Sequence, residues 1–298
     1  MEKCLNHFEV TDAGEDHELM ILFLDKEMKL SKKMERDKMI FESHAHYDDA
    51  AFDADREELL KQCQEQGIET IVNVSASLAS VKSTLALSEQ HNFIYGAIGI
   101  HPDEVGELDE EAFAWLREQC SRPKVVAVGE IGLDYYWDKE KRELQKYWFH
   151  RQMELAKELK LPIIVHSREA AADTLEAVRE AHTPELRGVI HCFSYTPEIA
   201  KEYLDMGCYI GIGGVITFKN AKKLKAVVKM LPLERILLET DCPYLAPEPY
   251  RGKRNSSLNL PYVAEAIGQL KGVEAEEVIR VTNANAKALY FGKSNYTF

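Results

Sequence analysis

The chain has 298 residues, 45% of them hydrophobic, so it is long enough to bury a full core as one large α/β barrel or two smaller domains. Its formal net charge is −13, which argues against a surface that coats nucleic acid non-specifically. A disordered chain and a broadly basic binding protein are therefore not indicated, and any nucleic-acid contact should be local.

The cysteines show no regular framework and no Cys-x-x-Cys pair, which favours reduced thiols over disulfides. Residues 19–24 form the longest early apolar stretch, far short of the roughly 20 residues that span a membrane, and no basic leader precedes it. We therefore expect a cytoplasmic protein that neither enters a membrane nor needs an obligate protein partner. The cysteines are Cys4, Cys63, Cys120, Cys192, Cys208 and Cys242.

Residues 1–38 differ from the rest of the chain, because mixed polar residues lead into a highly charged stretch. We interpret them as an N-terminal extension, with two explanations open. In the first, the start codon is placed too far upstream, and Met34 or Met39 begins the domain. In the second, the segment is a short amphipathic helix packed on the outside. Residues 39–298 are expected to form a single domain without a linker.

From residue 39 onward, apolar β-rich runs alternate with helical patterns. Continuous hydrophobic strands separated by helices predict a parallel sheet covered on its outer faces. Eight such units in about 260 residues predict a single (β/α)₈ barrel of the TIM type. The expected strands are residues 39–41, 70–74, 94–98, 125–128, 162–165, 188–190, 209–212 and 236–238.

Three helices carry clear signals. Thr196 is a typical N-cap, Pro197 and Glu198 suit the first turn, and Gly207 suits the position after the helix. Similar signals bracket residues 55–67. Residues 138–160 predict the longest helix.

Six side chains that can bind metal stand at or just past the ends of the expected strands. His44 and His46 would point to the same side of an extended segment, because side chains alternate there. Glu130 follows the fourth strand, where a carboxylate can bridge two cations through its two oxygens. Gly129 and Gly132 flank it, so the backbone can turn tightly and let a ligand come close.

His166 and His191 each come directly after an apolar strand, and Asp241 closes the eighth. Because the carboxyl ends of parallel barrel strands meet at one face, we expect these residues and the three preceding ones to form one site. Four imidazoles and two carboxylates suffice for two divalent cations with positions left for water and substrate. Mixed nitrogen and oxygen ligands leave Mg²⁺, Mn²⁺ and Zn²⁺ all open.

Three neighbouring residues have expected roles outside direct coordination. Glu239 lies two positions before Asp241, one layer deeper, so we expect it to orient a ligand histidine or water. Cys192 and Cys242 adjoin two candidate ligands, but strand alternation would aim them away from the site. We therefore expect both cysteines to be packing residues.

Several segments together resemble the TatD-like metal-dependent deoxyribonucleases of the amidohydrolase superfamily, and the resemblance runs from residue 39 to about residue 292. It rests on residues 42–46, 99–102, 129–135, 165–168, 191–194 and 238–243. The resemblance implies a (β/α)₈ barrel that uses divalent metal to hydrolyse phosphodiester bonds in DNA. The expected activity is that of a 3′-5′ exodeoxyribonuclease on single strands.

The resemblance also implies roles for individual residues. His101 would lie near the scissile phosphate, and we take Asp241 as the proton acceptor and Glu130 as the second catalytic residue. The implied ligands are His44, His46 and Asp241 for one cation, His166 and His191 for the other, and Glu130 for both.

The loop after the last strand departs from the family pattern, which often has Asn-Glu-Pro where this chain reads Asn255-Ser256-Ser257. Residues 1–38 have no counterpart in the family pattern either. The basic residues Arg251, Lys253 and Arg254 of the same loop are expected to neutralise phosphates, unless they are only a solvated charge run.

Aromatic residues come after Asp134 in the loop that leaves the fourth strand. Tyr135, Tyr136 and Trp137 offer faces on which splayed bases can stack, or they form the packing of the loop itself.

Two alternative functions remain open. The same barrel can hydrolyse another bond, such as a D-aminoacyl-tRNA ester or a lactone, because one fold hosts many chemistries. In the other, the metals stabilise a non-catalytic scaffold.

Overall fold

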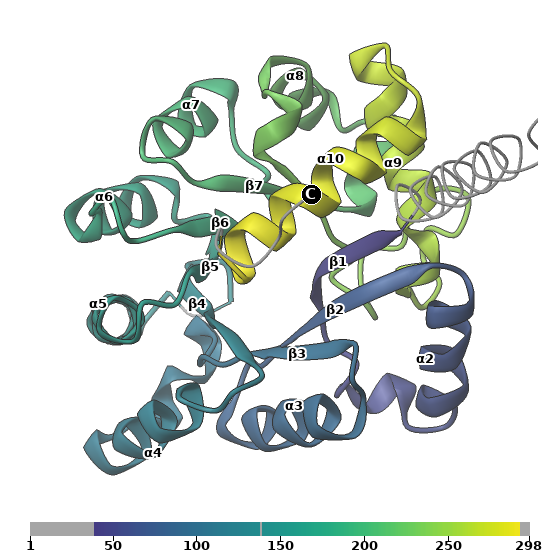
Figure 1. Cartoon of the computed structure of the whole chain (residues 1–298). Coiled ribbons are helices and arrows are strands. Elements are labelled where there is room, and N and C mark those ends of the chain that lie inside the picture. Colours follow the sequence, from purple (N-terminus) through teal and green to yellow (C-terminus); the bar gives the residue numbers. More distant parts are fainter. Residues whose placement is uncertain (1–38, 138, 293–298) are drawn as a thin grey trace, which may run out of the picture. The chain divides into compact units, whose positions relative to one another are not determined.

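Eight parallel strands form one sheet in chain order within residues 39–137 and 139–292, the part of the chain that this computed structural model describes. Helices surround the ring of strands (Figure 1). The expectation for residues 1–38 lies outside the described residues. The strands are β1 (Ile40–Ala45), β2 (Ile68–Val74), β3 (Ile94–Ala97), β4 (Val125–Asp134), β5 (Ile163–Arg168), β6 (Gly188–Ile190), β7 (Tyr209–Ile212) and β8 (Ile236–Leu238).

The last strand returns to the first. Ser43 Oγ donates a hydrogen bond of 2.8 Å to the carbonyl of Leu238, and the Asp241 amide donates one of 3.0 Å to the carbonyl of His44. The sheet is thereby closed into a barrel, and the prediction of a single (β/α)₈ fold is confirmed.

β1, β4 and β5 run further than their apolar runs predicted. Pairing continues past the apolar residues, with Gly132 of β4 in register with His166 of β5. His44, Glu130 and His166 therefore lie within β1, β4 and β5, toward their carboxyl ends. The expectation that these strands end before the three residues was wrong. The polar ends of these strands face a cavity, so they need no apolar residues to remain in the sheet.

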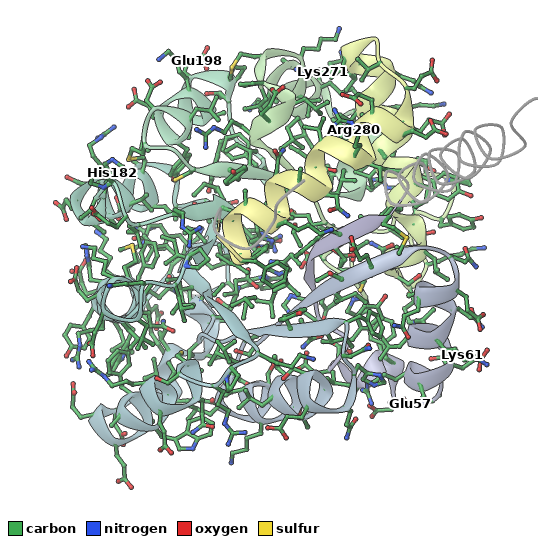
Figure 2. The ribbon with its side chains drawn as sticks, in the orientation of Figure 1. Glu57, Lys61, His182, Glu198, Lys271 and Arg280 are labelled. Atoms are coloured by element: carbon green, nitrogen blue, oxygen red, sulfur yellow. The ribbon has the colours of Figure 1, made fainter. Side chains whose placement is uncertain are left out.

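The helices cover the outside of the sheet, and their charged side chains, such as Glu57, Lys61 and Arg280, point outward (Figure 2). They are α2 (Arg56–Glu65), α3 (Leu78–Gln90), α4 (Glu110–Cys120), α5 (Arg142–Leu159), α6 (Ala171–Ala181), α7 (Pro197–Asp205), α8 (Lys222–Met230), α9 (Leu260–Lys271) and α10 (Ala275–Tyr290). Short 3-10 helices span Ala50–Phe52, Pro102–Glu107, Gly214–Thr217, Leu233–Arg235 and Ser257–Asn259.

The helices expected over residues 55–67 and 196–207 are found as α2 and α7. Thr196 caps α7 by position alone, since its side chain forms no capping hydrogen bond. The helix expected over residues 138–160 begins only at Arg142, because the chain first completes a turn after β4. No helix among the described residues is long and apolar enough to cross a membrane.

α10 closes the amino ends of the strands. The Asn285 side chain donates a hydrogen bond of 2.9 Å to the carbonyl of Ile236, where β8 begins, and the ring of Tyr290 stacks on Phe41 at 5.8 Å. The carboxyl ends therefore form the open face of the barrel. The buried cluster at the closed end includes Val72, Val126, Ile164, Val189, Leu237 and Leu289.

Candidate metal centre

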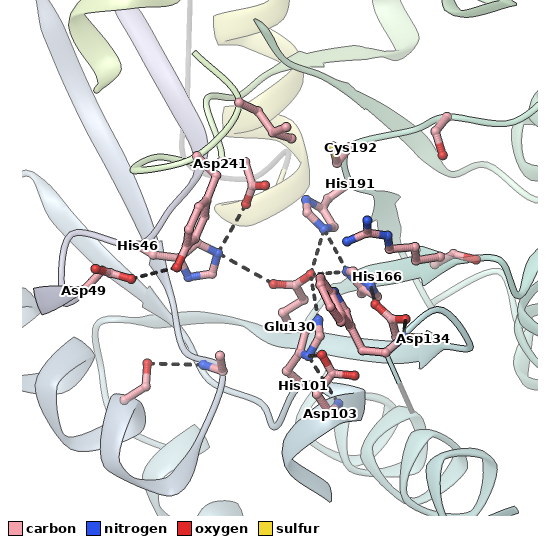
Figure 3. Close-up of a pocket in the computed structure, with 18 of the residues that line it drawn as sticks. His46, Asp49, His101, Asp103, Glu130, Asp134, His166, His191, Cys192 and Asp241 are labelled. Atoms are coloured by element: carbon pink, nitrogen blue, oxygen red, sulfur yellow. Dashed lines mark hydrogen bonds and ion pairs between the residues drawn. The ribbon is translucent and has the colours of Figure 1, made fainter. Parts of the chain in front are cut away.

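A cavity of about 790 Å³ opens at the carboxyl ends of the strands. Its walls come from most of the loops on this face, as the close-up in Figure 3 shows. Candidate residues that line it are His46, His101, Glu130, His166, His191 and Asp241, while His44 lies buried behind them.

Glu130 sits in the centre of the cavity floor because β4 is irregular there. The pairing of β4 with β5 shifts register between Val128 and Ile131, and such a bulge re-aims the intervening side chain. Gly132 then allows the two strands to approach, since a Cβ there would lie 2.0 Å from the carbonyl oxygen of His166. The glycine makes room for a neighbouring strand, not for a ligand as we expected.

The two carboxylate oxygens of Glu130 face two different groups of histidines. Oε1 lies 2.7 Å from His166 Nδ1 and 2.7 Å from His191 Nε2. Oε2 lies 3.4 Å from His44 Nε2 and 3.7 Å from His46 Nε2. One buried carboxylate, only 3% exposed, thus joins two sets of nitrogen donors, which is the arrangement of a bridging ligand.

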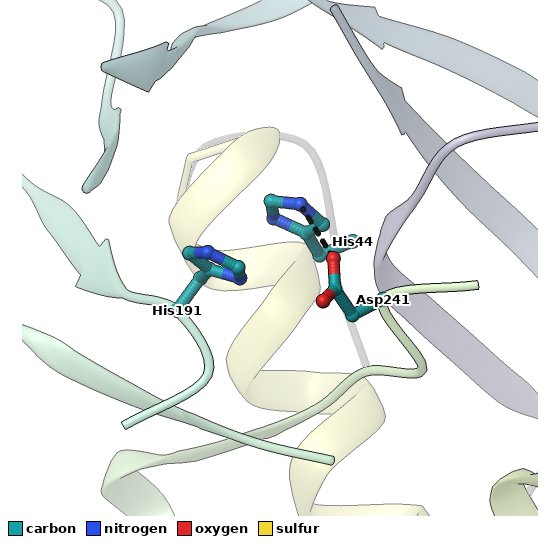
Figure 4. A group of neighbouring side chains, drawn as sticks. All are labelled: His44, His191 and Asp241. Atoms are coloured by element: carbon teal, nitrogen blue, oxygen red, sulfur yellow. Dashed lines mark ion pairs between the residues drawn. The ribbon is translucent and has the colours of Figure 1, made fainter. Parts of the chain in front are cut away.

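The donor atoms of the first group are spaced as ligands of one cation. Nε2 of His44 and Nε2 of His46 are 3.1 Å apart, and they lie 3.6 Å and 3.4 Å from Asp241 Oδ1. A tetrahedral ion with bonds of about 2.1 Å keeps its ligand atoms about 3.4 Å apart. Figure 4 shows His44 and Asp241 directed toward each other beside His191. The residues therefore fit a divalent cation.

The backbone orients one of these imidazoles. His46 Nδ1 lies 2.8 Å from the carbonyl oxygen of Val74, which can only accept, so the proton resides on Nδ1 in the neutral ring. The lone pair of Nε2 then faces the group, as a metal ligand requires.

The second group has a further carboxylate, Asp134, to which sequence reasoning gave no role. His166 Nδ1 lies 3.4 Å from His191 Nε2, while His166 Nε2 lies 3.1 Å from Asp134 Oδ2. Asp134 ends β4, four residues after Glu130, so strand alternation places both carboxylates on one face. That period-two spacing was the signal by which Asp134 could have been found.

His101 lines the cavity beside the second group, and its Nε2 lies 3.9 Å from Glu130 Oε1. It also forms a set of neighbouring donor atoms with Asp103 and Asp134. Its position is open to the cavity, which is where a residue near the scissile phosphate would have to lie.

Glu239 lies underneath His191. Its Oε1 accepts a hydrogen bond from the amide of Cys192 and lies 4.0 Å from His191 Nδ1. A Cβ at Gly211 would come within 2.2 Å of Glu239 Oε2, so only glycine leaves space for this carboxyl group. Burial raises the pKa of Glu239 to about 8. At 4.0 Å the carboxylate forms no hydrogen bond with His191 Nδ1, so the expected orienting role of Glu239 stays a prediction.

The charges of the two groups balance each other. Burial alone would raise the pKa of Glu130, but the imidazoles of His191 and His44 outweigh it and hold that pKa well below its usual range. Burial and the neighbouring His191 lower the pKa of His44 to about 4. Glu130 is therefore ionised and His44 neutral, the forms that a metal ligand requires.

Two other histidines have raised pKa values, in contrast to His44. Burial lowers the pKa of His46, but the hydrogen bond to Asp241 outweighs it and raises the pKa to about 10. Burial is likewise outweighed at His166, where Asp134 and Glu130 raise the pKa to about 9. Without cations, these two imidazoles hold protons in positions where a metal ion would otherwise balance the carboxylates.

The structure does not bring Tyr135 to the cavity. Its side chain is only 4% exposed, its hydroxyl donates a hydrogen bond of 2.7 Å to Asp173, and the Arg142 guanidinium covers its ring at 4.3 Å. Tyr136 and Trp137 are 46% and 65% exposed, and Trp137 lines the cavity. Of the three aromatic residues, only Tyr136 and Trp137 keep a face on which a base can stack.

The basic residues of the β8–α9 loop do not line the cavity either. Arg254 forms an ion pair of 2.6 Å with Asp55, and the Arg251 guanidinium lies over the ring of Phe218 at 4.2 Å. Among the described residues, Arg168, at the end of β5, is the arginine in the cavity wall, which contains no lysine. Arg168 belongs to one of the family-like segments, but sequence reasoning gave it no role.

The two cysteines next to candidate ligands differ in their exposure to the cavity. Cys242 is fully buried, as expected of a packing residue. Cys192 lines the cavity, because its φ of 45° breaks the strand alternation on which the expectation rested. The groups of candidate ligands within the described ranges contain neither cysteine.

Residues 255–257 belong to the support of the site. The Asn255 side chain donates hydrogen bonds to the carbonyls of Thr240 and Tyr244, at 3.0 Å and 2.8 Å, and thereby holds the loop that carries Asp241. Ser257 reaches the buried Glu42 of β1. The departure from the usual family sequence thus lies in the packing of the loop, and its residues do not line the cavity.

Comparisons with known proteins agree with this geometry. Residues 41–291 match the family model described as TatD related DNase. The chain is 43% identical over 252 residues to the uncharacterized metal-dependent hydrolase YabD of Bacillus subtilis (strain 168), with 85% of this chain and 99% of the relative covered. It is 34% identical over 246 residues to a protein of Pantoea vagans (strain C9-1) named 3′-5′ ssDNA/RNA exonuclease TatD, with 80% and 94% covered.

A solved structure is similar over the same region. The crystal structure of YjjV, a TatD homologue from Escherichia coli K12, matches with a TM-score of 0.81 and 30% identity, and the match covers 86% of this chain and 99% of that one.

Proposed function

Because this chain belongs to the TatD family of metal-dependent hydrolases, we propose that it is a 3′-5′ exodeoxyribonuclease that acts on single strands. The observation that carries the proposal is the division of the Glu130 carboxylate between two groups of donors at the floor of an open cavity. One relative bears the name of a 3′-5′ ssDNA/RNA exonuclease, which supports a nucleic acid as the substrate.

Two divalent cations, one in each group, would supply Lewis-acid activation of the scissile phosphate and balance the charge of its leaving oxygen. Glu130 keeps the two sets of ligands together through its two oxygens. Asp241 lines the cavity with 18% of its side chain exposed, so its carboxylate can accept a proton from an attacking water. The mixed donor set leaves Mg²⁺, Mn²⁺ and Zn²⁺ all open.

The wall of the cavity supplies groups that suit a splayed nucleotide. The Arg168 guanidinium lies 4.1 Å from the ring centre of Tyr136 and 5.4 Å from that of Trp137. The exposed face of Trp137 suits a base, and Arg168 suits a phosphate. A base must leave its stack to use such a wall, which favours single strands over duplexes.

The proposal is tested with single-stranded oligonucleotides labelled at either end and incubated with Mg²⁺, Mn²⁺ or Zn²⁺. We expect stepwise shortening from the 3′ end that stops on chelation and in the Glu130→Gln variant. A metal-loaded protein that leaves every oligonucleotide intact while hydrolysing a D-aminoacyl-tRNA or a lactone would overturn the proposal.

A further inference from the structure

α8 and the loop before it form a basic element in an acidic protein. No acidic residue occurs between Asp205 and Glu234, although the whole chain has a net charge of −13. Four of the five lysines in this stretch are exposed and Lys225 is partly exposed. The five are Lys219, Lys222, Lys223, Lys225 and Lys229.

These lysines have no ion-pair partner within residues 39–137 and 139–292. On other helices, Lys201 pairs with Asp205 on α7 and Arg280 pairs with Glu277 on α10, while the exposed Lys82 of α3 lies over the ring of Trp115 at 5.7 Å. The unpaired charge is thus concentrated on one side of the barrel, between α7 and α9 (Figure 1).

The positions of these lysines lower the stability of α8. Lys222, Lys225 and Lys229 recur at helical spacing on one face, where like charges repel. α8 also has no acid in its first turn and carries Lys222 and Lys223 there, at the positive end of the helix dipole. Helix stability therefore does not explain these residues, whereas a bound polyanion would relieve the repulsion.

The basic residues continue into the β8–α9 loop. Arg251 of the β8–α9 loop lies over Phe218, the residue before Lys219, and Lys253 is exposed beside it. The two loops pack closely, because the amide of Glu248 donates a hydrogen bond of 2.9 Å to Thr217 Oγ1. We call Arg251, Lys253 and the five lysines the basic strip.

The β8–α9 loop also forms part of the cavity wall. Tyr244 and Leu245 line the cavity and are 55% and 39% exposed. The carbonyl of Leu245 lies so close to Gly214 that a Cβ there would be 2.2 Å from it. The β8–α9 loop thus connects the cavity wall to the basic strip.

We propose that the basic strip binds the backbone of single-stranded nucleic acid outside the cavity, on the part of the strand that has not yet been cleaved. This inference rests on the proposed function. Lysines contact phosphates without reading sequence, and the acidic remainder of the surface repels the strand from other paths. The strip therefore favours long strands over short ones and leaves the chemistry at the metal centre unchanged.

The test compares two triple variants of equal charge change. One removes the strip on α8 (Lys222→Gln, Lys225→Gln, Lys229→Gln), and the matched control removes exposed or half-exposed lysines on α2, α5 and α7 (Lys61→Gln, Lys157→Gln, Lys201→Gln). Glutamine keeps the helix propensity of lysine, and circular dichroism checks the folding of both. For each protein, kcat/KM is measured on a dinucleotide and on a strand of about 20 nucleotides over a range of salt concentration.

We expect the strip variant to lose about tenfold in kcat/KM on the long strand, with a log–log salt slope shallower by about 2, because each phosphate contact on a single strand contributes about 0.7. Its dinucleotide turnover and both activities of the control should match the wild type. An unchanged slope and an unchanged preference for long strands would overturn the inference.

Binding of the long strand, measured by fluorescence anisotropy, separates this inference from the proposed function. If the wild type cleaves no oligonucleotide, the proposed function fails. Loss of strand binding in the strip variant alone would still support the strip, and equal binding by all three proteins would overturn it.

Discussion

Ser257 Oγ donates a hydrogen bond of 2.9 Å to Glu42 Oε2 and so ties the loop after β8 to the first strand. Glu42 is completely buried, and burial raises its pKa to about 7. Its other hydrogen bonds come from Thr240 and the amide of His44. The loop residue that departs from the usual family sequence thus supports the two segments that carry His44 and Asp241.

We predict that Ser257→Ala lowers the free energy of unfolding by about 1–3 kcal/mol, because a buried acceptor loses a donor. Chemical denaturation of the metal-free protein measures the change. Ser256→Ala is the matched control, since Ser256 is partly exposed and its side chain forms no hydrogen bond in the described structure, so it should change stability by less than about 0.5 kcal/mol. Equal effects of the two substitutions would contradict the role given to Ser257.

Replacement of the bridging carboxylate should separate activity from folding. Glu130→Gln removes the charge shared by the two groups, so we expect at least about a hundredfold loss of metal-dependent hydrolysis. Mutation of residues that only hydrogen-bond to metal ligands already lowers activity by up to about a hundredfold. Metal content per chain, measured by elemental analysis, should fall as well, while circular dichroism stays unchanged. Wild-type turnover with full metal content would refute the bridging assignment.

Metal affinity should rise with pH. In the metal-free protein the pKa values of His46 and His166 are raised to about 10 and 9, so both imidazoles are protonated near neutral pH. Each cation must displace about one proton, and affinity should increase until the pH passes these values. Calorimetry in buffers of different ionisation enthalpy measures the released protons. Binding without proton release at pH 7 would contradict the prediction.

The raised pKa values of His46 and His166 also determine how the stability of the metal-free protein changes with pH. Both folded pKa values lie above the ordinary value of 6.5, so the protonated imidazoles contribute stability that is fully present below pH 6.5. That contribution is lost as the pH rises through about 9 to 10. Melting temperatures of the metal-free protein across this range check the direction.

Arg168 should contribute to substrate binding. It is the arginine of the described cavity wall, so Arg168→Met should raise KM for a single strand about tenfold while the bound metal remains. Arg179→Met on α6 is the control, because Arg179 is exposed and pairs with Glu202. The prediction fails if both variants keep the KM of the wild type.

The glycine under the metal centre should not tolerate a methyl group. In Gly211→Ala the new Cβ would collide with Glu239 Oε2, so we expect a loss of about 1–3 kcal/mol in stability. We also expect lower activity, because the amide of Cys192, next to His191, would lose its hydrogen-bond acceptor. Gly207→Ala offers the contrast of a glycine with open space around it, where only the positive φ of 80° resists substitution.

The barrel could be predicted from sequence because eight apolar runs alternated with helices, and the six candidate ligands converged because parallel strands share one open end. The features that could not be predicted depended on the ends of those strands. Glu130 required a bulge, and Cys192 required a left-handed backbone that no local pattern indicated. Tyr135 looked available for stacking, but contacts with Arg142 of α5 and Asp173 of α6 bury it. The loop sequence alone does not indicate these contacts.

The order of the ligands along the chain sets when the centre can assemble. His44 and His46 lie on or just after the first strand and Asp241 comes after the last, and α10, which plugs the opposite end, is made later still. During synthesis the histidines therefore leave the ribosome long before their carboxylate partner exists. The first group of donors is therefore complete only after β8 has been made, and a cation that needs all three side chains would bind after that point.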